Sequence, residues 1–141
     1  MSEENAEFVR KAIEAFNAFM RGEVSREAIL DLGDPQFEFN WHDERTMPDL
    51  PQRLRGPLEL LGFWEDLRSA WDDLILVPLE LTEARDNRVL TLTRQVGRGR
   101  ESGVPVEVHA FNVWTIRDGK VRKIELFRHR AEALKAAGLR E

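Results

Sequence analysis

The strongest constraint on the fold is a pair of strand-like runs joined by Asp118-Gly119 in the last third of the chain. Asp-Gly between two alternating apolar runs is the strongest short-range hairpin signal, because both central residues of the tight turn take positive φ. In the first run, side chains two apart share a face of the strand, and one such row is apolar except at Asn112. This pattern predicts a cavity wall with one polar group. The row consists of Val106, Val108, Ala110, Asn112, Trp114 and Ile116.

Composition restricts the class of protein. The 141 residues favour a single domain over 1–141, and 42% hydrophobic with 33% charged residues is typical of a globular chain rather than a disordered one. The absence of cysteine excludes disulfides, iron–sulfur clusters, thiolate zinc sites and a cysteine nucleophile. Because the net charge is −5 with acids and bases interspersed, we expect no nucleic-acid partner. No signal peptide or membrane span is visible, so we expect a cytoplasmic protein with no membrane partner.

The periodicities predict an α+β fold. Helical spacing is found over 3–21, in a short second helix capped by Ser25, in a third opened by Gly56-Pro57 and buried along Leu60 to Trp71, and in a short terminal helix. Strand patterns cover 37–43, 72–84, 89–96 and the two runs that meet at 117–120, and a polar loop over 44–55 is long enough to cover a site. We therefore expect helices gathered on one face of a long, curved sheet that encloses a cone.

The opposite row of the penultimate strand is also apolar, at Phe111 and Val113. Apolar groups on both faces of a strand mean that both faces are covered. Since the predicted helices cover only one face, we expect a second subunit on the other.

Several motifs together resemble a SnoaL-like member of the NTF2-like superfamily. The resemblance covers nearly the whole chain and implies a cone-shaped barrel with a curved mixed or antiparallel sheet, helices on its concave face and a homodimer formed through the outer face. The superfamily includes ketosteroid isomerase, polyketide cyclases, limonene epoxide hydrolase and scytalone dehydratase, so the fold implies a cavity and not one reaction. The motifs are Phe19-Met20-Arg21-Gly22-Glu23, Phe39-Asn40-Trp41-His42-Asp43, Gly56-Pro57 before Phe63-Trp64, Val113 to Lys120, and Phe127 to Leu134.

Asp43 and Asn112 are the candidate catalytic residues. Asp43 ends the alternating row of Phe37, Phe39 and Trp41, where aromatic neighbours would raise its pKa toward that of a general base. The resemblance places it where ketosteroid isomerase has its proton-abstracting aspartate, and Asn112 where that enzyme has an oxyanion-hole acid. A solvated strand-end aspartate and a satisfied buried amide stay open as alternatives. The tyrosine donor of that enzyme has no counterpart, because the chain contains no tyrosine.

The expected ligand is a small apolar carbonyl compound. Phe39, Trp41, Trp64 and Trp114 would line an apolar pocket. Arg94 interrupts the row of Leu90, Leu92 and Val96. It can point inward to hold a substrate carboxylate, pair with Asp43, or lie in solvent near the strand end.

We expect no cofactor and no metal site, because His42, His109 and His129 have no metal-ligand spacing. Two functions stay open. One is a cofactor-independent isomerase, cyclase, hydratase or hydrolase that uses an aspartate as general acid and base. The other is a non-catalytic module for ligand binding or dimerisation.

Overall fold

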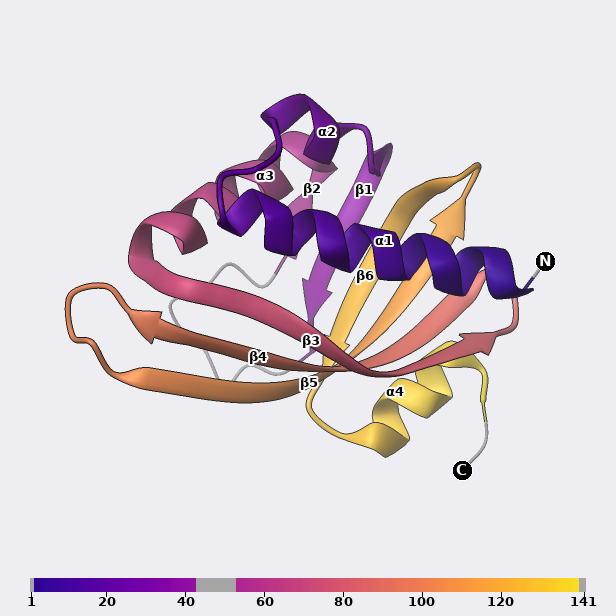
Figure 1. The fold of residues 1–141 in the computed structure, drawn as a ribbon. Coiled ribbons are helices and arrows are strands. Elements are labelled where there is room, and N and C mark those ends of the chain that lie inside the picture. The colour runs from indigo at the N-terminus through magenta and orange to yellow at the C-terminus, as the bar shows by residue number, and fades with distance from the viewer. Residues whose placement is uncertain (1, 43–52, 140–141) are drawn as a thin grey trace.

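The computed structural model describes residues 2–42 and 53–139, which form a curved six-stranded sheet and four helices (Figure 1). The strand order is β2-β1-β6-β5-β4-β3, with β1 parallel to β6 and every other neighbouring pair antiparallel. The sheet is therefore mixed and unclosed. In chain order the elements are α1 (Ser2–Met20), α2 (Arg26–Leu30), β1 (Gly33–Trp41), β2 (Arg53–Arg55), α3 (Gly56–Ala70), β3 (Trp71–Ala84), β4 (Arg88–Gly99), β5 (Pro105–Arg117), β6 (Lys120–Phe127) and α4 (Arg130–Ala137).

The helices form where the sequence predicts them. In α1, Val9, Ile13, Phe16 and Phe19 follow helical spacing, and each is at most 4% exposed. Pro57 lies in the first turn of α3, where its missing N–H removes no hydrogen bond. Trp71, expected on the buried stripe of this helix, instead begins β3. None of the helices in the described residues is long and apolar enough to cross a membrane.

The predicted hairpin between β5 and β6 is confirmed. Asp118 and Gly119 have φ of 52° and 71°, the left-handed conformation that such a turn requires. The short strand β2 was missed, because its three residues lie inside the segment expected to be a loop. It pairs antiparallel with β1 at one edge of the sheet.

The open edge at β3 is covered by α1. Asn17 Nδ2 donates to the Leu76 carbonyl at 2.9 Å, and Leu76 N donates to Asn17 Oδ1 at 2.8 Å. The Asn17 side chain thus takes the place of a neighbouring strand at this point. Such cover matters because unpaired backbone groups of an edge strand invite pairing with other chains.

Both faces of the sheet are covered at β5, but by different helices. Trp114 and Ile116 pack on the concave side with α1 and α3, whereas Val113 packs with Leu90 and with Ala133 of α4 on the outer side. The expectation that all helices lie on one face is thus wrong for α4, which Figure 1 shows on the opposite side of the sheet from α1. Val113 therefore needs no second subunit to be buried.

The first half of β5 is more exposed than its pattern suggests. Val106 is 37% exposed, and Val108 is only half-buried. In Figure 1 the β4–β5 hairpin extends past α1 at its tip, so α1 does not cover the inner row there. Of the predicted row, Asn112, Trp114 and Ile116 are buried.

Candidate active site on the concave face

The aromatic residues predicted to line a pocket form the inner wall of the sheet and its helical cover. The Phe39 and Trp41 rings lie 4.3 Å apart, and Trp41 meets Phe63 of α3 edge-on at 5.3 Å. Trp64 meets Phe16 of α1 edge-on at 4.7 Å. Perpendicular contacts of this kind are favourable because the positive edge of one ring faces the negative face of the other. The sheet and helices are thus held together by aromatic packing.

Asn112 lies on this inner wall, in line with Trp41. Leu126 of β6 is the register partner of both Trp41 on β1 and Asn112 on β5. Two strand spacings therefore separate Trp41 from Asn112, roughly 10 Å. The Asn112 side chain is buried, and its Oδ1 has no hydrogen-bond partner among residues 2–42 and 53–139. Since more than nine in ten buried polar groups are paired, this unpaired amide oxygen needs an explanation.

The neighbouring inner position on β4 is also polar but is satisfied. Thr91, the register partner of Asn112, is fully buried, and its Oγ1 accepts a hydrogen bond from Trp114 Nε1 at 3.0 Å. Thr93, two residues along the same inner row, is 1% exposed. The sequence pattern does not indicate either threonine as a site residue, because the row of Leu90, Leu92 and Val96 is the more apolar one and so resembles the inner row. Their placement follows from the register of β4 with β5.

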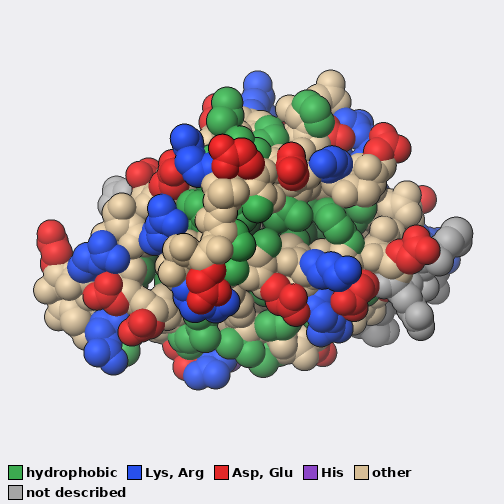
Figure 2. All heavy atoms as spheres, turned by 45° about the horizontal axis from the view of Figure 1, so that its top comes forward, with side chains coloured by type: hydrophobic (Ala, Val, Ile, Leu, Met, Phe, Trp, Pro, Cys, Tyr) green, Lys and Arg blue, Asp and Glu red, His purple; other side chains and the backbone are tan. Residues whose placement is uncertain are grey.

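A small apolar cavity lies between the sheet and the helices. It has a volume of about 40 Å³, and Trp64 and Trp114 are among the apolar residues of α1, α2, α3 and the sheet that line it. Figure 2 shows apolar side chains in the middle of the helical face, ringed by charged ones. A single water needs about 10–15 Å³, whereas small-molecule sites usually measure about 300–1,000 Å³. A ligand therefore enters this space only if side chains move apart. Phe39, Trp41 and Asn112 are not among its lining residues.

Arg94 does not point inward. Its register partner is His109, and the same row carries Leu90 and Val113, which pack under α4 on the outer face. Its Nη2 donates to Glu107 Oε1 at 3.1 Å, and both side chains are about half exposed. The predicted inward direction of Arg94 is therefore wrong. Val89 and Leu90 are buried on opposite faces of β4, so the sequence there does not alternate between apolar and polar residues and does not show which row faces inward. A solvated position, the third alternative, is the one observed.

Asp43 lies outside the described residues. Among those described, the buried polar side chains are Asp34, Thr91, Thr93 and Asn112. Asp34 belongs to a different site, because Arg117 donates to both of its oxygens, at 2.9 and 3.0 Å. The hydrogen bonds from Arg117 and from the Gln36 backbone hold the pKa of Asp34 below its usual value. The fully buried polar side chains of the described inner wall are therefore one amide and two hydroxyls.

His42 and Glu125 lie together on the outer face. His42 Nε2 is 3.2 Å from Glu125 Oε2, and its ring stacks on Phe127 at 4.7 Å. Glu125 also approaches Lys123 Nζ at 3.8 Å. Within residues 2–42 and 53–139, no group of three or more His, Asp or Glu side chains is arranged to hold a metal ion.

Comparison with known proteins identifies the fold family. The crystal structure of a protein from Jannaschia sp. CCS1, described as a SnoaL-like polyketide cyclase, superposes on this chain with a TM-score of 0.73. The two sequences are 20% identical, and the match covers 100% of this chain and 96% of that one. A protein from Bacillus subtilis described as an isomerase superposes with a TM-score of 0.72 at 19% identity, covering 98% of this chain and 95% of that one. A protein of ketosteroid isomerase-like fold from Catenulispora acidiphila, solved in complex with trimethylamine, superposes with a TM-score of 0.66 at 14% identity. The match covers 92% of this chain and 93% of that one. No curated protein matches the chain significantly.

These likenesses show the fold, and the sequence itself shows the family. The model of the SnoaL-like domain matches residues 9–124, which include most of the first helix, the aromatic strand β1 and most of the β5–β6 hairpin. Together with the mixed curved sheet and its helical cover, this match establishes that the chain belongs to the SnoaL-like domain family of the NTF2-like fold.

Proposed function

We propose that this chain binds a small, largely apolar carbonyl compound between the sheet and its helices, with the amide of Asn112 as the polar anchor. The single observation that carries the proposal is the buried Asn112 Oδ1, which has no partner in the described part of the chain. An unpaired buried acceptor destabilises a folded protein by about 1–3 kcal/mol. Functional sites are where such a loss is tolerated, because a ligand supplies the missing partner.

The amide suits a ligand with a polar oxygen. It carries a donor and an acceptor on adjacent atoms, and a half-turn of the amide group exchanges them. Its NH₂ can donate to the oxygen of a carbonyl or of the enolate formed from it, and its oxygen can accept from a hydroxyl. Around it, Trp114, Leu126 and Trp41 supply apolar surface. A ligand with one polar end and an otherwise apolar body matches this wall.

The catalytic form of the proposal depends on Asp43. In the sequence it ends the alternating pattern of 37–43, which predicts that its side chain shares the face of Trp41. Its carboxylate would take a proton from the carbon next to the carbonyl and return it at another carbon, while Asn112 donates a hydrogen bond to the enolate oxygen. A hydratase or hydrolase would use the same carboxylate to activate water. No cofactor takes part in either route.

A non-catalytic binding module is the second candidate. The observation that favours it is the inner wall itself, since the fully buried polar groups that the described residues place there are an amide and two hydroxyls. The two candidates differ in what Asp43 does. Catalysis requires its carboxylate, whereas binding requires only the apolar wall and the amide of Asn112.

Thermal-shift screening against aromatic and polyketide-like ketones tests the proposal. A compound that raises the melting temperature of the wild type, but not of Asn112→Leu, would support the site. Incubation of that compound with wild type and Asp43→Asn then separates the candidates, with Asp66→Asn on α3 as the matched control. If wild type and Asp66→Asn convert the compound but Asp43→Asn does not, and if Asp43→Asn keeps the wild-type melting temperature, the protein is an enzyme that uses Asp43. Binding without turnover indicates the binding module. A screen in which no compound raises the melting temperature of the wild type contradicts both candidates.

We also propose that two chains associate through the outer face of the sheet. Its exposed part carries the half-buried side chains of Val77 and Leu92, and the Arg94–Glu107 ion pair lies beside them. A twofold axis through this face would put apolar side chains against apolar ones. Sedimentation equilibrium of wild type and Leu92→Glu tests it. We expect a wild-type dimer that the added charge dissociates, and a monomeric wild type would contradict the proposal.

A further inference from the structure

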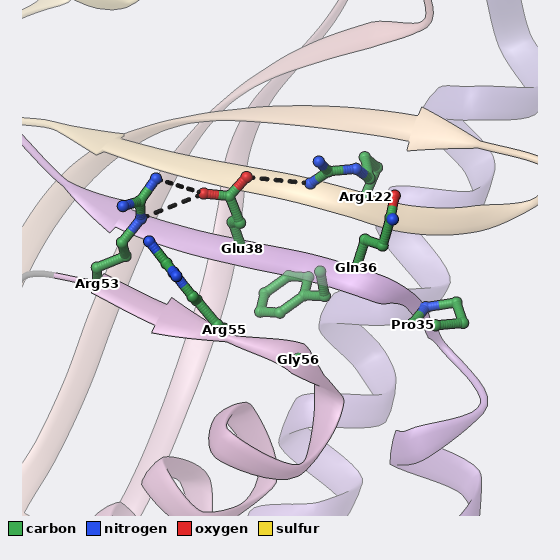
Figure 3. Close-up of a pocket in the computed structure, with 8 residues that line it drawn as sticks. Pro35, Gln36, Glu38, Arg53, Arg55, Gly56 and Arg122 are labelled. Atoms are coloured by element: carbon green, nitrogen blue, oxygen red, sulfur yellow. Dashed lines mark hydrogen bonds and ion pairs between the residues drawn. The ribbon is translucent and has the colours of Figure 1, made fainter.

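Three arginines converge on a groove in the sheet at β1, β2 and β6, on the face opposite Asn112 (Figure 3). Arg53 and Arg55 are alternate residues of β2, so their side chains share the outer face, while Leu54 between them is buried in the core. Arg122 reaches the same groove from β6, at an irregularity in the strand register. The chain as a whole is acidic, so this cluster is a local reversal of charge.

Glu38 is the carboxylate among these arginines, and both of its oxygens are engaged. Its Oε1 accepts from Arg53 Nη2 at 2.8 Å and from Arg53 Nε at 3.2 Å, and its Oε2 accepts from Arg122 Nη1 at 3.3 Å. The hydrogen bond from Arg53, followed by that from Arg122, holds the pKa of Glu38 below its usual value. Glu38 thus remains an anion and offers no donor to a ligand.

Arg55 is the surplus cation of the groove. Its backbone is the register partner of Glu38, yet the Glu38 carboxylate is bound to the other two arginines. Among the described residues, the Arg55 guanidinium has no ion-pair partner. Figure 3 shows it lying toward the Arg53 guanidinium. Two like charges side by side are unfavourable unless an anion joins them. Glu59 accepts from Arg55 N at 2.7 Å, so the start of α3 is already occupied.

The remaining polar wall of the groove also presents a donor. Gln36 Oε1 accepts from Arg117 Nη2 at 2.9 Å, which leaves the amide NH₂ of Gln36 for another partner. The groove has a volume of about 530 Å³, within the usual range of small-molecule sites of about 300–1,000 Å³. Its available side-chain groups are therefore donors, and most of them are charged.

We propose that this groove binds a small organic or inorganic anion through carboxylate or phosphate oxygens. A guanidinium presents a planar fork of N–H groups that matches either anion with two parallel hydrogen bonds. Alternate residues of a strand are about 6.6 Å apart, so Arg53 and Arg55 can engage two oxygens of one phosphate or two acidic groups of one ligand. The proposal does not depend on the function of the concave face. Phe37 is the residue common to the lining of the groove and of the inner apolar cavity.

Isothermal titration calorimetry with inorganic phosphate, pyrophosphate and succinate tests the proposal on the full chain. We expect saturable binding of at least one probe that weakens as NaCl is raised. Tighter binding of phosphate or pyrophosphate than of succinate would identify a phosphate site, and the reverse order a carboxylate site. No saturable binding of any of the three probes would overturn the proposal.

Variants assign any binding to the groove. Arg55→Gln should weaken it about tenfold or more, since a charge-assisted hydrogen bond is lost. Its melting temperature should change little, because the Arg55 guanidinium has no ion-pair partner among the described residues. Arg53→Gln should weaken binding too. Arg98→Gln, at an exposed position of β4, is the matched control and should bind as the wild type does. Equal weakening in Arg98→Gln and Arg55→Gln would mean general charge attraction and would overturn the proposal.

Discussion

Replacing Asn112 by leucine removes a buried amide oxygen that has no hydrogen-bond partner among the residues that the structure describes. Leucine has the same number of side-chain heavy atoms and the same branching, so the change removes polarity with little change of shape. Because relief of an unpaired buried acceptor is worth about 1–3 kcal/mol, we expect Asn112→Leu to be more stable than the wild type by that amount. Most substitutions at buried positions destabilise, so the expected sign is unusual.

The matched control is Asn17→Leu. The Asn17 amide is satisfied by two hydrogen bonds to the Leu76 backbone, at 2.8 and 2.9 Å. Their loss leaves backbone groups of the edge strand β3 without partners, although water can reach some of them. We expect this substitution to destabilise the protein by about 1–3 kcal/mol. The same chemical change at two asparagines should thus have opposite effects.

Urea denaturation followed by circular dichroism measures both free energies of unfolding, with equal slopes as the check on two-state behaviour. For a chain of this length, 1 kcal/mol corresponds to roughly 3 °C in melting temperature. Asn112→Leu should therefore melt about 3–10 °C above the wild type, and Asn17→Leu a similar amount below it. If Asn112→Leu is destabilised as much as Asn17→Leu, the Asn112 amide is bonded in the folded protein and the argument for a ligand anchor fails.

Two further predictions concern satisfied polar groups. Thr91→Val leaves the buried Trp114 Nε1 without its acceptor and should lower the free energy of unfolding by about 1–3 kcal/mol in the same assay; an unchanged value would contradict the assigned bond. The pKa of Asp34 is lowered in the folded state, mainly by the hydrogen bonds from Arg117 and then by that from the Gln36 backbone. The stability that this carboxylate contributes is therefore complete above its unfolded pKa of about 3.9 and is lost as the pH falls through the folded pKa. The stability difference between wild type and Asp34→Asn should therefore be constant from neutral pH down to about pH 5 and shrink below about pH 4, and a difference that persists undiminished to pH 2 would contradict the Arg117 pairing.

Much of the fold could be predicted from local patterns. The helical stripe of α1, the proline that opens α3 and the positive φ of Asp118 and Gly119 are properties of short segments, so the sequence carries them directly. β2 is different, because three residues give no periodicity and form a strand only by pairing with β1. The position of α4 also depends on tertiary packing, since its buried Ala133 and Ala137 fit either face equally well in sequence.

The residues of the candidate site also divide into those that a local pattern predicts and those that only tertiary packing places. Asn112 stood out because one polar residue interrupts an apolar row, and its strand continues without a break through that row. Arg94 interrupts a similar row, but burial on both faces at Val89 and Leu90 makes the direction of β4 ambiguous from sequence alone. The arginine groove was not predicted, because it joins β2, which has no strand signal, to an irregularity in β6 that brings Arg122 to Glu38. Its one local trace is the alternation of Arg53, Leu54 and Arg55.

The most direct test of the ligand-anchor claim follows the side-chain amide of Asn112 by NMR. The ¹⁵N–¹H signals are assigned by their absence from Asn112→Leu and are followed while a ketone that raises the melting temperature is added. We predict that these signals shift and saturate at the same ligand concentration as binding itself, while those of Asn17 stay in place. Binding that leaves the Asn112 amide signals unchanged would contradict the claim.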